Sequence, residues 1–219
     1  MSMNKQAGNM YNWTSHTWNP IRGECPHDCK YCYMKGFKVG KLRLEEKELK
    51  TRLGKGNTIF VGSSVDMFAE RVSGSWIKLV LRYCMQFDEN TYLFQSKNPR
   101  RFKKFLALFP TNTILGTTIE TNRDNDLSKA PSVSDRVASM TELRSPKMVS
   151  IEPVLDFDRT VMLRWIQAIN PKFVSIGADS KNHNLPEPSK DKLLELIEQM
   201  EKFTEVKVKS NLDRILKGE

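Results

Sequence analysis

The chain has 219 residues, of which 39% are hydrophobic and 28% charged, and no apolar run approaches the length of a membrane span. These values indicate a soluble globular protein with one domain, residues 1–219, and exclude a membrane protein. The N-terminal segment has no apolar stretch of signal-peptide type, so we expect a cytoplasmic location and no membrane partner. Lys and Arg outnumber Asp and Glu by 35 to 26, and the formal charge of +9 favours a polyanionic partner such as nucleic acid.

Short apolar runs alternate with longer helical stretches along the chain. A first strand is expected within residues 12–20, followed by a cysteine-rich loop and a helical stretch. Further strands are expected at residues 57–64, 91–97, 112–120, 147–153, 172–179 and 205–211, and the helices between them at 75–87, 99–109, 132–143, 158–169 and 189–203. Pro99 suits the first position of its helix, and Ser189 suits an N-cap.

This order gives six β-α units and a seventh strand, which predicts a parallel sheet with both faces covered. A closed barrel of eight units takes about 250 residues. We therefore expect an α/β fold in the form of an open, partial (β/α)6 TIM-like barrel.

Polar residues concentrate directly after the predicted strands, where parallel α/β folds bind their ligands. They are Ser63, Ser64, Asp66, Gln95, Ser96, Lys97, Thr117, Thr118, Glu120, Asn122, Glu152, Asp179, Lys209 and Asn211. Glu120 and Glu152 lie in apolar contexts, where a carboxylate without a partner would be costly. The sequence therefore predicts one ring of polar groups at the carboxyl edge of the sheet.

Three cysteines, Cys25, Cys29 and Cys32, lie in the loop "RGECPHDCKYCYMKGF" with the spacing C-x3-C-x2-C. In a reducing compartment, clustered thiols indicate metal or redox chemistry. A structural zinc takes four ligands, commonly as two pairs, and the chain has no second pair; His27 lies too close to its neighbours to complete a tetrahedron without strain. Cys84 is on an apolar helix face and is interpreted as a buried core residue. Three thiolates would leave one iron of a [4Fe–4S] cluster open to a substrate or cofactor.

The cysteine spacing, with an aromatic residue before the last cysteine, resembles the signature of the radical S-adenosylmethionine (SAM) superfamily. The strings "TWNPIRGECPHDCKYCY", "IFVGSSVDMF", "LFQSKNPRRF", "LGTTIETN", "SIEPVL" and "VKVKSNL" resemble the landmarks of a phage-borne and bacterial family of radical-SAM-like proteins without a settled activity. The resemblance implies the partial barrel of that superfamily and a [4Fe–4S] cluster on Cys25, Cys29 and Cys32. It also implies reductive cleavage of SAM to a 5′-deoxyadenosyl radical and an electron donor such as flavodoxin.

The same resemblance implies roles for the strand-end residues. The expected SAM-binding residues are Tyr31, Gly62, Ser63, Ser64, Asp66, Ser96, Lys97, Thr117, Thr118, Glu120 and Gly177. Among them, Tyr31 would pack near the adenine, Lys97 would pair with the SAM carboxylate, and Glu120 suits the ribose hydroxyls. Glu152 and Lys209 are the candidate catalytic residues.

The chain departs from that family in "SIGADSKNHNLPEP" and in the final "KSNL", both where substrate should bind. The thiol loop and the charge together predict an enzyme for a nucleic acid or modified nucleobase. One example is modification or repair of thymine-type bases in phage DNA, by analogy with the lyase that repairs spore photoproduct. The basic segments 35–52 and 97–104 are the expected phosphate contacts. Two alternatives stay open: a zinc-stabilised nucleic-acid-binding protein without catalysis, and a radical SAM enzyme that acts on a small molecule or a partner protein.

Overall fold

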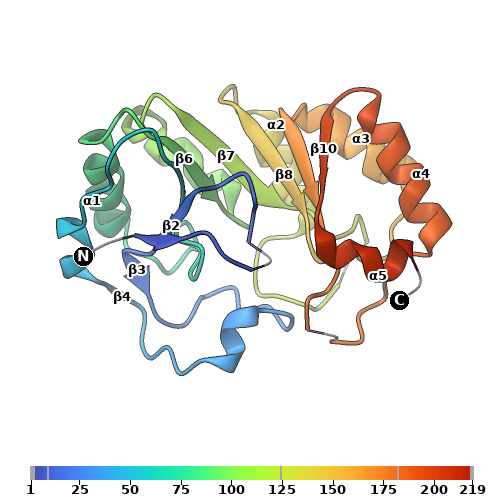
Figure 1. The fold of residues 1–219 in the computed structure, drawn as a ribbon, viewed down its shortest axis with the longest axis horizontal. Coiled ribbons are helices and arrows are strands. Elements are labelled where there is room, and N and C mark those ends of the chain that lie inside the picture. Colours follow the sequence, from blue (N-terminus) through green and yellow to red (C-terminus); the bar gives the residue numbers. More distant parts are fainter. Residues whose placement is uncertain (1–2, 9, 124, 182, 218–219) are drawn as a thin grey trace.

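One eight-stranded sheet organises the protein in a computed structural model that describes residues 3–8, 10–123, 125–181 and 183–217 (Figure 1). Its strands lie in the order β1 (Asn4–Lys5), β2 (His16–Trp18), β5 (Thr58–Val61), β6 (Thr91–Gln95), β7 (Thr113–Thr118), β8 (Lys147–Ile151), β9 (Phe173–Ile176) and β10 (Glu205–Val208). β1 is antiparallel to β2, and all other neighbours are parallel. β1 and β10 are the two edges of the sheet. The predicted α/β fold, an open partial barrel with its parallel strands in chain order, is therefore confirmed.

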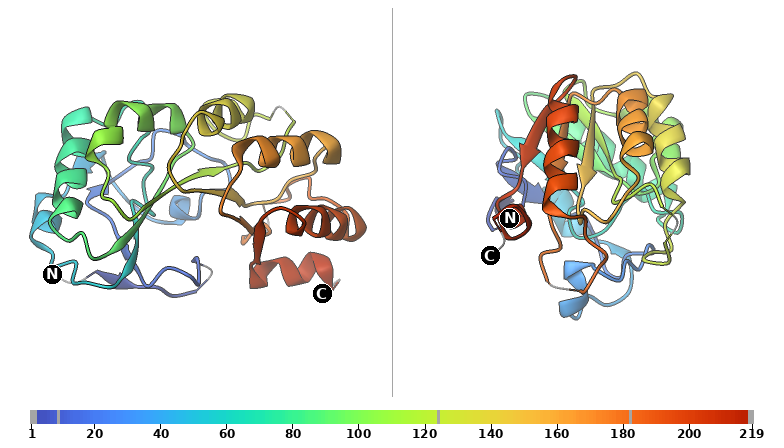
Figure 2. Two further views of the ribbon diagram at one scale, coloured as in Figure 1. Left: turned by 90° about the horizontal axis from the view of Figure 1, so that it is seen from above. Right: turned by 90° about the vertical axis from the view of Figure 1, so that its right-hand side faces the viewer.

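Helices connect the parallel strands and cover the outer face of the sheet. The α-helices are α1 (Gly74–Met85), α2 (Val133–Thr141), α3 (Arg159–Ile169), α4 (Lys190–Glu201) and α5 (Asp213–Leu216), and the 3₁₀ helices are η1 (Tyr33–Gly36), η2 (Glu46–Lys50), η3 (Pro99–Leu108) and η4 (Ser210–Leu212). Seen from above, the helices form an arc from α1 to α4, and the two chain ends lie at opposite ends of the molecule (Figure 2). None of the helices in the described residues has the length and apolarity needed to cross a bilayer.

The first β-α unit differs from the prediction, because the stretch after the cysteine loop forms no α-helix. It contains the short η1 and η2 and a two-stranded antiparallel sheet of β3 (Ile21–Arg22) and β4 (Arg43–Leu44). Gly40, between the two 3₁₀ helices, has a φ of +69°, which interrupts any helical conformation there. Gly23 is packed so closely that a Cβ would lie 2.4 Å from the carbonyl oxygen of Lys41. The segment therefore folds as a tightly packed loop.

Buried strands and capped helices explain why the remaining units follow the sequence pattern. Every residue of β8 and of β9 is buried, as expected for strands covered on both faces, whereas the edge strand β10 is half-exposed. The Ser189 side chain accepts a hydrogen bond from Lys192 N–H, which confirms it as the N-cap of α4. Pro99 begins η3, so the predicted helix is present there in 3₁₀ form.

Arg101, within one of the two predicted phosphate-binding segments, is a structural residue. It is buried, and its guanidinium donates to the carbonyl oxygens of Ala69, Glu70 (3.3 Å) and Val72 (3.0 Å). These carbonyls belong to the loop that follows β5, so Arg101 holds that loop against η3. Arg101 is therefore not available for phosphate, and the expected phosphate contacts of the segment 97–104 would have to come from its other basic residues.

We predict that Arg101→Met lowers the free energy of unfolding by about 2–4 kcal/mol, because it leaves several buried carbonyls without a donor. The neighbouring Arg100 is exposed, and Arg100→Met should change stability by less than about 0.5 kcal/mol. Urea unfolding followed by circular dichroism measures both. Equal stabilities of the two variants would contradict the structural role of Arg101.

Candidate active site

A cavity of about 530 Å³ opens at the carboxyl edge of the parallel strands. Its wall consists of the cysteine loop (residues 22–37), residues at and beyond the ends of β5 to β10, and the N-terminal segment around Tyr11. A cavity of this size is typical of a small-molecule or cofactor site. It lies at the edge where the sequence predicted a ring of polar groups.

The three thiols of the cysteine loop all line this cavity. Cys25, Cys29 and Cys32 are free and half-buried, whereas Cys84 is buried within α1, as predicted. Among the described residues, no three His, Cys, Asp or Glu side chains converge closely enough to hold a single metal ion. Burial and the nearby Asp66 carboxylate raise the pKa of the Cys25 thiol to about 12. Three soft sulfur donors along one wall fit a cluster that distributes its thiolate ligands over several iron atoms.

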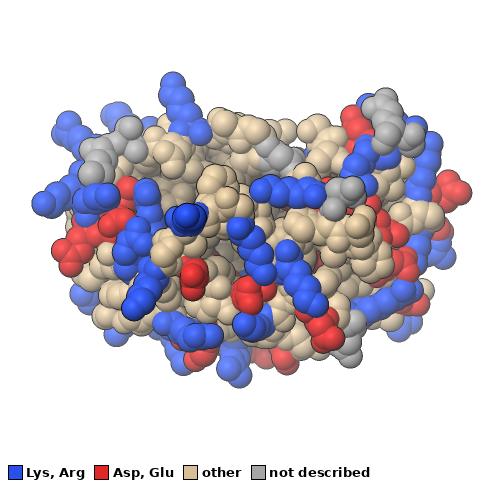
Figure 3. All heavy atoms as spheres, turned by 90° about the horizontal axis from the view of Figure 1, so that it is seen from below, with Lys and Arg blue, Asp and Glu red and all other residues tan. Residues whose placement is uncertain are grey.

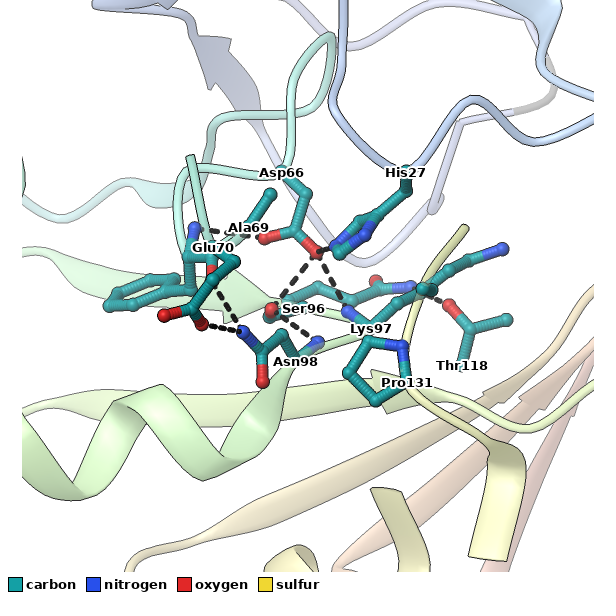
Figure 4. Close-up of polar contacts among 12 residues, drawn as sticks. His27, Asp66, Ala69, Glu70, Ser96, Lys97, Asn98, Thr118 and Pro131 are labelled. Carbon is teal, nitrogen blue, oxygen red and sulfur yellow. Dashed lines mark hydrogen bonds and ion pairs between the residues drawn. The ribbon is translucent and has the colours of Figure 1, made fainter. Parts of the chain in front are cut away.

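The Asp66 carboxylate connects the cysteine loop to two strand ends (Figure 4). Its Oδ2 accepts hydrogen bonds from His27 Nε2 (2.7 Å), Ser96 Oγ (2.9 Å) and Lys97 N–H (2.8 Å), and its Oδ1 accepts one from Phe68 N–H (2.9 Å). Burial raises the pKa of Asp66, but the interactions with His27, Lys97 N–H and Ser96 outweigh burial and lower it. Because both of its oxygens accept hydrogen bonds, Asp66 links the cysteine loop to the loop after β5 and to the end of β6.

Glu120 lies at the centre of a second buried cluster. Its Oε1 accepts hydrogen bonds from the Tyr31 hydroxyl and from Lys97 Nζ (2.7 Å), and its Oε2 accepts one from Arg136 Nη1 (2.8 Å). Lys97 Nζ also contacts the Tyr31 hydroxyl and lies 3.4 Å from Cys29 Sγ. The cluster therefore places a lysine ammonium directly beside the cysteine loop.

The charges of this cluster shift the pKa values of its members. Burial raises the pKa of Glu120, but the positive charges of Lys97 and Arg136 outweigh burial and lower it from 4.5 to about 2. Burial lowers the pKa of Lys97, but the interactions with Glu120, Tyr31 and Cys29 together outweigh burial and raise it. Both groups are therefore charged at neutral pH, and with Arg136 the cluster carries a net positive charge.

A further ion pair lies in the same cavity wall. Lys209 Nζ is 2.8 Å from both carboxylate oxygens of Glu152 and 5.2 Å from the centre of the Tyr11 ring. The Tyr11 hydroxyl contacts Gln95 Oε1 (2.8 Å) and Ser150 Oγ (2.9 Å). Burial, with the negative charge of Glu152, raises the pKa of Tyr11. The two candidate catalytic residues are thus adjacent and paired.

The loop after β5 presents backbone and hydroxyl groups to the cavity. Gly62 has a φ of +79°, and a Cβ there would lie 3.1 Å from the carbonyl oxygen of Val65, so this tight turn requires glycine. Ser64 donates through its N–H (2.9 Å) and its hydroxyl (3.0 Å) to Asn19 Oδ1. Asn19 therefore fixes the loop from the cysteine-loop side.

Most residues predicted at the site line the cavity. They are Cys25, Cys29, Tyr31, Cys32, Gly62, Ser63, Ser64, Asp66, Ser96, Lys97, Thr118, Glu152 and Lys209. Three others stand behind its wall. Glu120 is buried in the cluster described above, and Thr117 is buried with its hydroxyl donating to Ser96 O (2.8 Å). A Cβ on Gly177 would lie 3.1 Å from the Glu152 carboxylate, so Gly177 makes room for that side chain.

Sequence reasoning missed four residues of the site. Arg136 lies in an amphipathic helix, where nothing distinguishes it from a surface arginine, and Tyr11 lies in an N-terminal segment without strand pattern. Asp179 was included in the polar ring, but its partner His183 was not; their Oδ1 and Nδ1 atoms lie 2.6 Å apart at the cavity. The expected departure of the segment "SIGADSKNHNLPEP" from the family pattern is the one sequence signal that points to this pair. Lys181, in the same segment, also lines the cavity.

Fold and site together define an α/β protein with an open parallel sheet and a three-thiol cavity at the carboxyl edge. Residues 9–186 match the family described as "Protein of unknown function (DUF5131)". The match covers most of the chain, which therefore belongs to this family. Among curated proteins, none matches the sequence.

Solved structures of spore photoproduct lyase are similar to this chain in fold. One mutant of the lyase aligns with a TM-score of 0.66 at 11% identity, over 94% of this chain and 80% of the lyase chain. The lyase complexed with dinucleoside spore photoproduct aligns with 0.59 at 12% identity, over 90% of this chain and 64% of the other. A double mutant with bound AdoMet and dinucleoside spore photoproduct aligns with 0.58 at 12% identity, over 92% and 66%. This chain thus spans less than two thirds of the lyase chains in these two complexes, and the similarity establishes the fold.

We predict that Glu120→Gln lowers the free energy of unfolding at pH 7 by about 3 kcal/mol, since Lys97 and Arg136 lose their buried counter-charge. The depressed pKa of Glu120 means that its contribution is complete above its ordinary value of 4.5 and is lost as the pH falls toward about 2. The stability gap between wild type and variant should therefore narrow from about pH 5 to about pH 3. Urea unfolding over this range measures the gap.

The exposed pair Glu142–Lys103 supplies the control, because Glu142→Gln removes a carboxylate that is 60% exposed. This variant should differ little from wild type at every pH. A Glu120→Gln gap that stays constant down to about pH 3 would contradict the assigned charge state.

Proposed function

We propose that this protein is a radical SAM enzyme that holds a [4Fe–4S] cluster with Cys25, Cys29 and Cys32 and acts on a nucleic acid or modified nucleobase. The observation that carries the proposal is that these three thiols line one cavity at the carboxyl edge of an open parallel sheet. The similarity in fold to a lyase solved with AdoMet and a dinucleoside supports it. A reduced cluster held by these thiols would supply one electron for cleavage of the S–C5′ bond of SAM to methionine and a 5′-deoxyadenosyl radical, and that radical would take a hydrogen atom from the substrate.

Lys97 is the residue that we assign to the SAM carboxylate. Its ammonium lies beside Cys29 and is held by Glu120, so a carboxylate bound next to the cysteine loop would meet a positive charge already in position. Glu120 is itself held by Arg136, which makes Glu120 and Arg136 positioning residues for Lys97. The remaining cavity-lining groups offer hydrogen bonds and contacts to the amino, ribose and adenine parts of SAM; these are Tyr31, Gly62, Ser63, Ser64, Ser96 and Thr118.

The substrate would occupy the part of the cavity beside Glu152 and Lys209. A paired carboxylate and ammonium present an acceptor and a donor side by side, which suits the polar edge of a nucleobase. Tyr11 and the His183–Asp179 pair lie in the same wall. A base inside a duplex would have to leave the stack to reach this depth.

Exposed basic residues surround the cysteine loop. In the segment 30–52 they are Lys30, Lys35, Lys38, Lys41, Arg43, Lys47, Lys50 and Arg52. Figure 3 shows Lys and Arg side chains spread over the face that carries this loop, with fewer Asp and Glu among them. A face with an excess of positive charge attracts the phosphates of a nucleic-acid backbone, which supports a polymeric nucleic acid as the substrate.

We predict that anaerobic reconstitution loads about four irons and four sulfides per chain. On reduction by dithionite or a flavodoxin system, the protein should release 5′-deoxyadenosine and methionine from SAM, measured by chromatography. Cys29→Ala should lose both the brown chromophore and the cleavage, because two thiolates hold the cluster poorly. Cys84→Ala is the matched control and should keep both, because Cys84 is buried in α1.

Different outcomes separate the alternatives. One zinc without sulfide would replace the proposal with a zinc-stabilised binding protein. A full cluster without any 5′-deoxyadenosine would contradict SAM cleavage. A colourless Cys84→Ala protein would contradict the three-thiolate ligand set.

We predict that DNA or RNA binding weakens steeply with salt, with a log–log slope of about −0.9 per phosphate contact on duplex. The double variant Lys38→Ala/Lys41→Ala should make the slope shallower by about 1 to 2, measured by fluorescence anisotropy. The control is Lys202→Ala, which removes an exposed lysine at the end of α4 that pairs with Glu198. Absence of binding at low salt would favour a small-molecule substrate.

A further inference from the structure

Two aromatic side chains on the cysteine loop are exposed to solvent, and the role proposed above for the thiols does not use them. Phe37 is 61% exposed and Tyr33 is 41% exposed. Both belong to one turn, because η1 spans Tyr33–Gly36 and Phe37 N–H closes it by donating to Met34 O (3.0 Å). Exposure of a large apolar ring costs solvation free energy, so a ring displayed on a rigid turn is a candidate for ligand contact.

This turn lies at the mouth of the cavity. Tyr33 is part of the cavity wall, and its hydroxyl donates to Ser63 O (2.8 Å). Lys181, which also lines the cavity, donates to Tyr33 O (3.1 Å), and its Nζ lies 6.0 Å from the centre of the Phe37 ring. The two rings therefore lead from the cavity wall to the open surface.

The charge around Phe37 is positive. Lys35 and Lys38 flank Phe37 in the sequence and are exposed, Lys41 is exposed four residues after it, and Lys181 Nζ lies near its ring. Lys35 is paired with Asp28 (3.0 Å) at the surface, where water and salt weaken such pairs. An exposed ring among lysines is the arrangement that binds an unpaired base and its phosphates together.

We propose that Phe37, supported by Tyr33, is a stacking platform for an unpaired base of a nucleic acid, next to the nucleotide that enters the cavity. The inference rests on the proposed function and specifies how the substrate is held. A single ring face is enough for a base, because stacking requires only one flat contact. A stable protein interface needs about 800 Å² on each partner and a core depleted of lysine, which this narrow, lysine-rich turn does not offer.

The test measures binding of a fluorescently labelled single-stranded oligonucleotide to the cluster-loaded protein by anisotropy. Phe37→Ala should weaken binding by about 5- to 150-fold, the range for loss of one stacked base. Phe37→Trp, which keeps a flat ring, should bind like wild type. Phe203→Ala is the control, because Phe203 is also exposed but lies after α4, just ahead of β10 and so at the opposite edge of the sheet.

A second measurement identifies the contact directly. An oligonucleotide with 5-iodouracil at single positions should crosslink to Phe37 or Tyr33 on irradiation, and mass spectrometry locates the attached peptide. Thermal unfolding and iron content confirm that the variants are folded and loaded.

The outcomes distinguish the two proposals. If wild type binds but Phe37→Ala binds equally well without crosslinking at 33–37, the platform is wrong and the proposed function stands. If wild type binds no oligonucleotide, the nucleic-acid substrate fails and the platform with it. Normal oligonucleotide binding by Phe37→Ala together with slower reduction by flavodoxin would overturn the inference in favour of an electron-donor surface. A changed oligomeric state would overturn it in favour of self-association.

Discussion

The hydrogen bonds to the Asp66 carboxylate are the interactions on which the arrangement of the cavity wall depends. Four donors from the cysteine loop, the β5 loop and the end of β6 converge on it, and its side chain is only 10% exposed. An ionised carboxylate in such a place is tolerated only with this many hydrogen bonds. The cysteine loop has no α-helix to support it, so His27 and Asp66 take over the task of fixing the thiols relative to the sheet. The ligand role that we propose for the three thiols requires support of this kind.

The Lys97–Glu120–Arg136 cluster adds charge to that support. A buried ion pair contributes little net stability, because desolvation of both groups opposes their attraction. In this structure the cluster fixes the positions of its members. One oxygen of Glu120 accepts a hydrogen bond from Arg136 of α2, and the other accepts one from Lys97 at the end of β6. The excess positive charge lies beside Cys29, with Lys97 Nζ 3.4 Å from its Sγ, and favours an anionic ligand group over a neutral one at this place.

The sequence predicted the strands well, because the five strands from β5 to β9 are mainly apolar runs ended by polar or glycine residues, and the edge strand β10 alternates charged and apolar residues. The rule that ligands bind at the carboxyl ends of parallel strands then placed the cavity correctly. The sequence did not predict which side chains pair in three dimensions. Nothing in the string shows that Glu120 turns toward Arg136, or that Tyr11 crosses to Ser150, 139 residues away. The helix predicted after the cysteine loop is absent, because Gly40 adopts a positive φ that a helix does not allow. The charge pattern of the segment also gives no sign of the close packing at Gly23.

The charged residues of the cavity wall fall into two groups. Lys97, Glu120 and Asp66 are held by the cysteine loop, the β5 loop and α2, whereas Glu152 is held by Lys209 and Asp179 by His183, all from β8 onward. The two groups are linked at one point, because Lys181, from the loop after β9, donates to Tyr33 O of the cysteine loop (3.1 Å). The segments expected from the sequence to depart from the family pattern, "SIGADSKNHNLPEP" and "KSNL", contain Asp179, His183 and Lys209 of the second group. Since one fold can carry different substrate sites, we look to this second group for the class of substrate in the function that we propose.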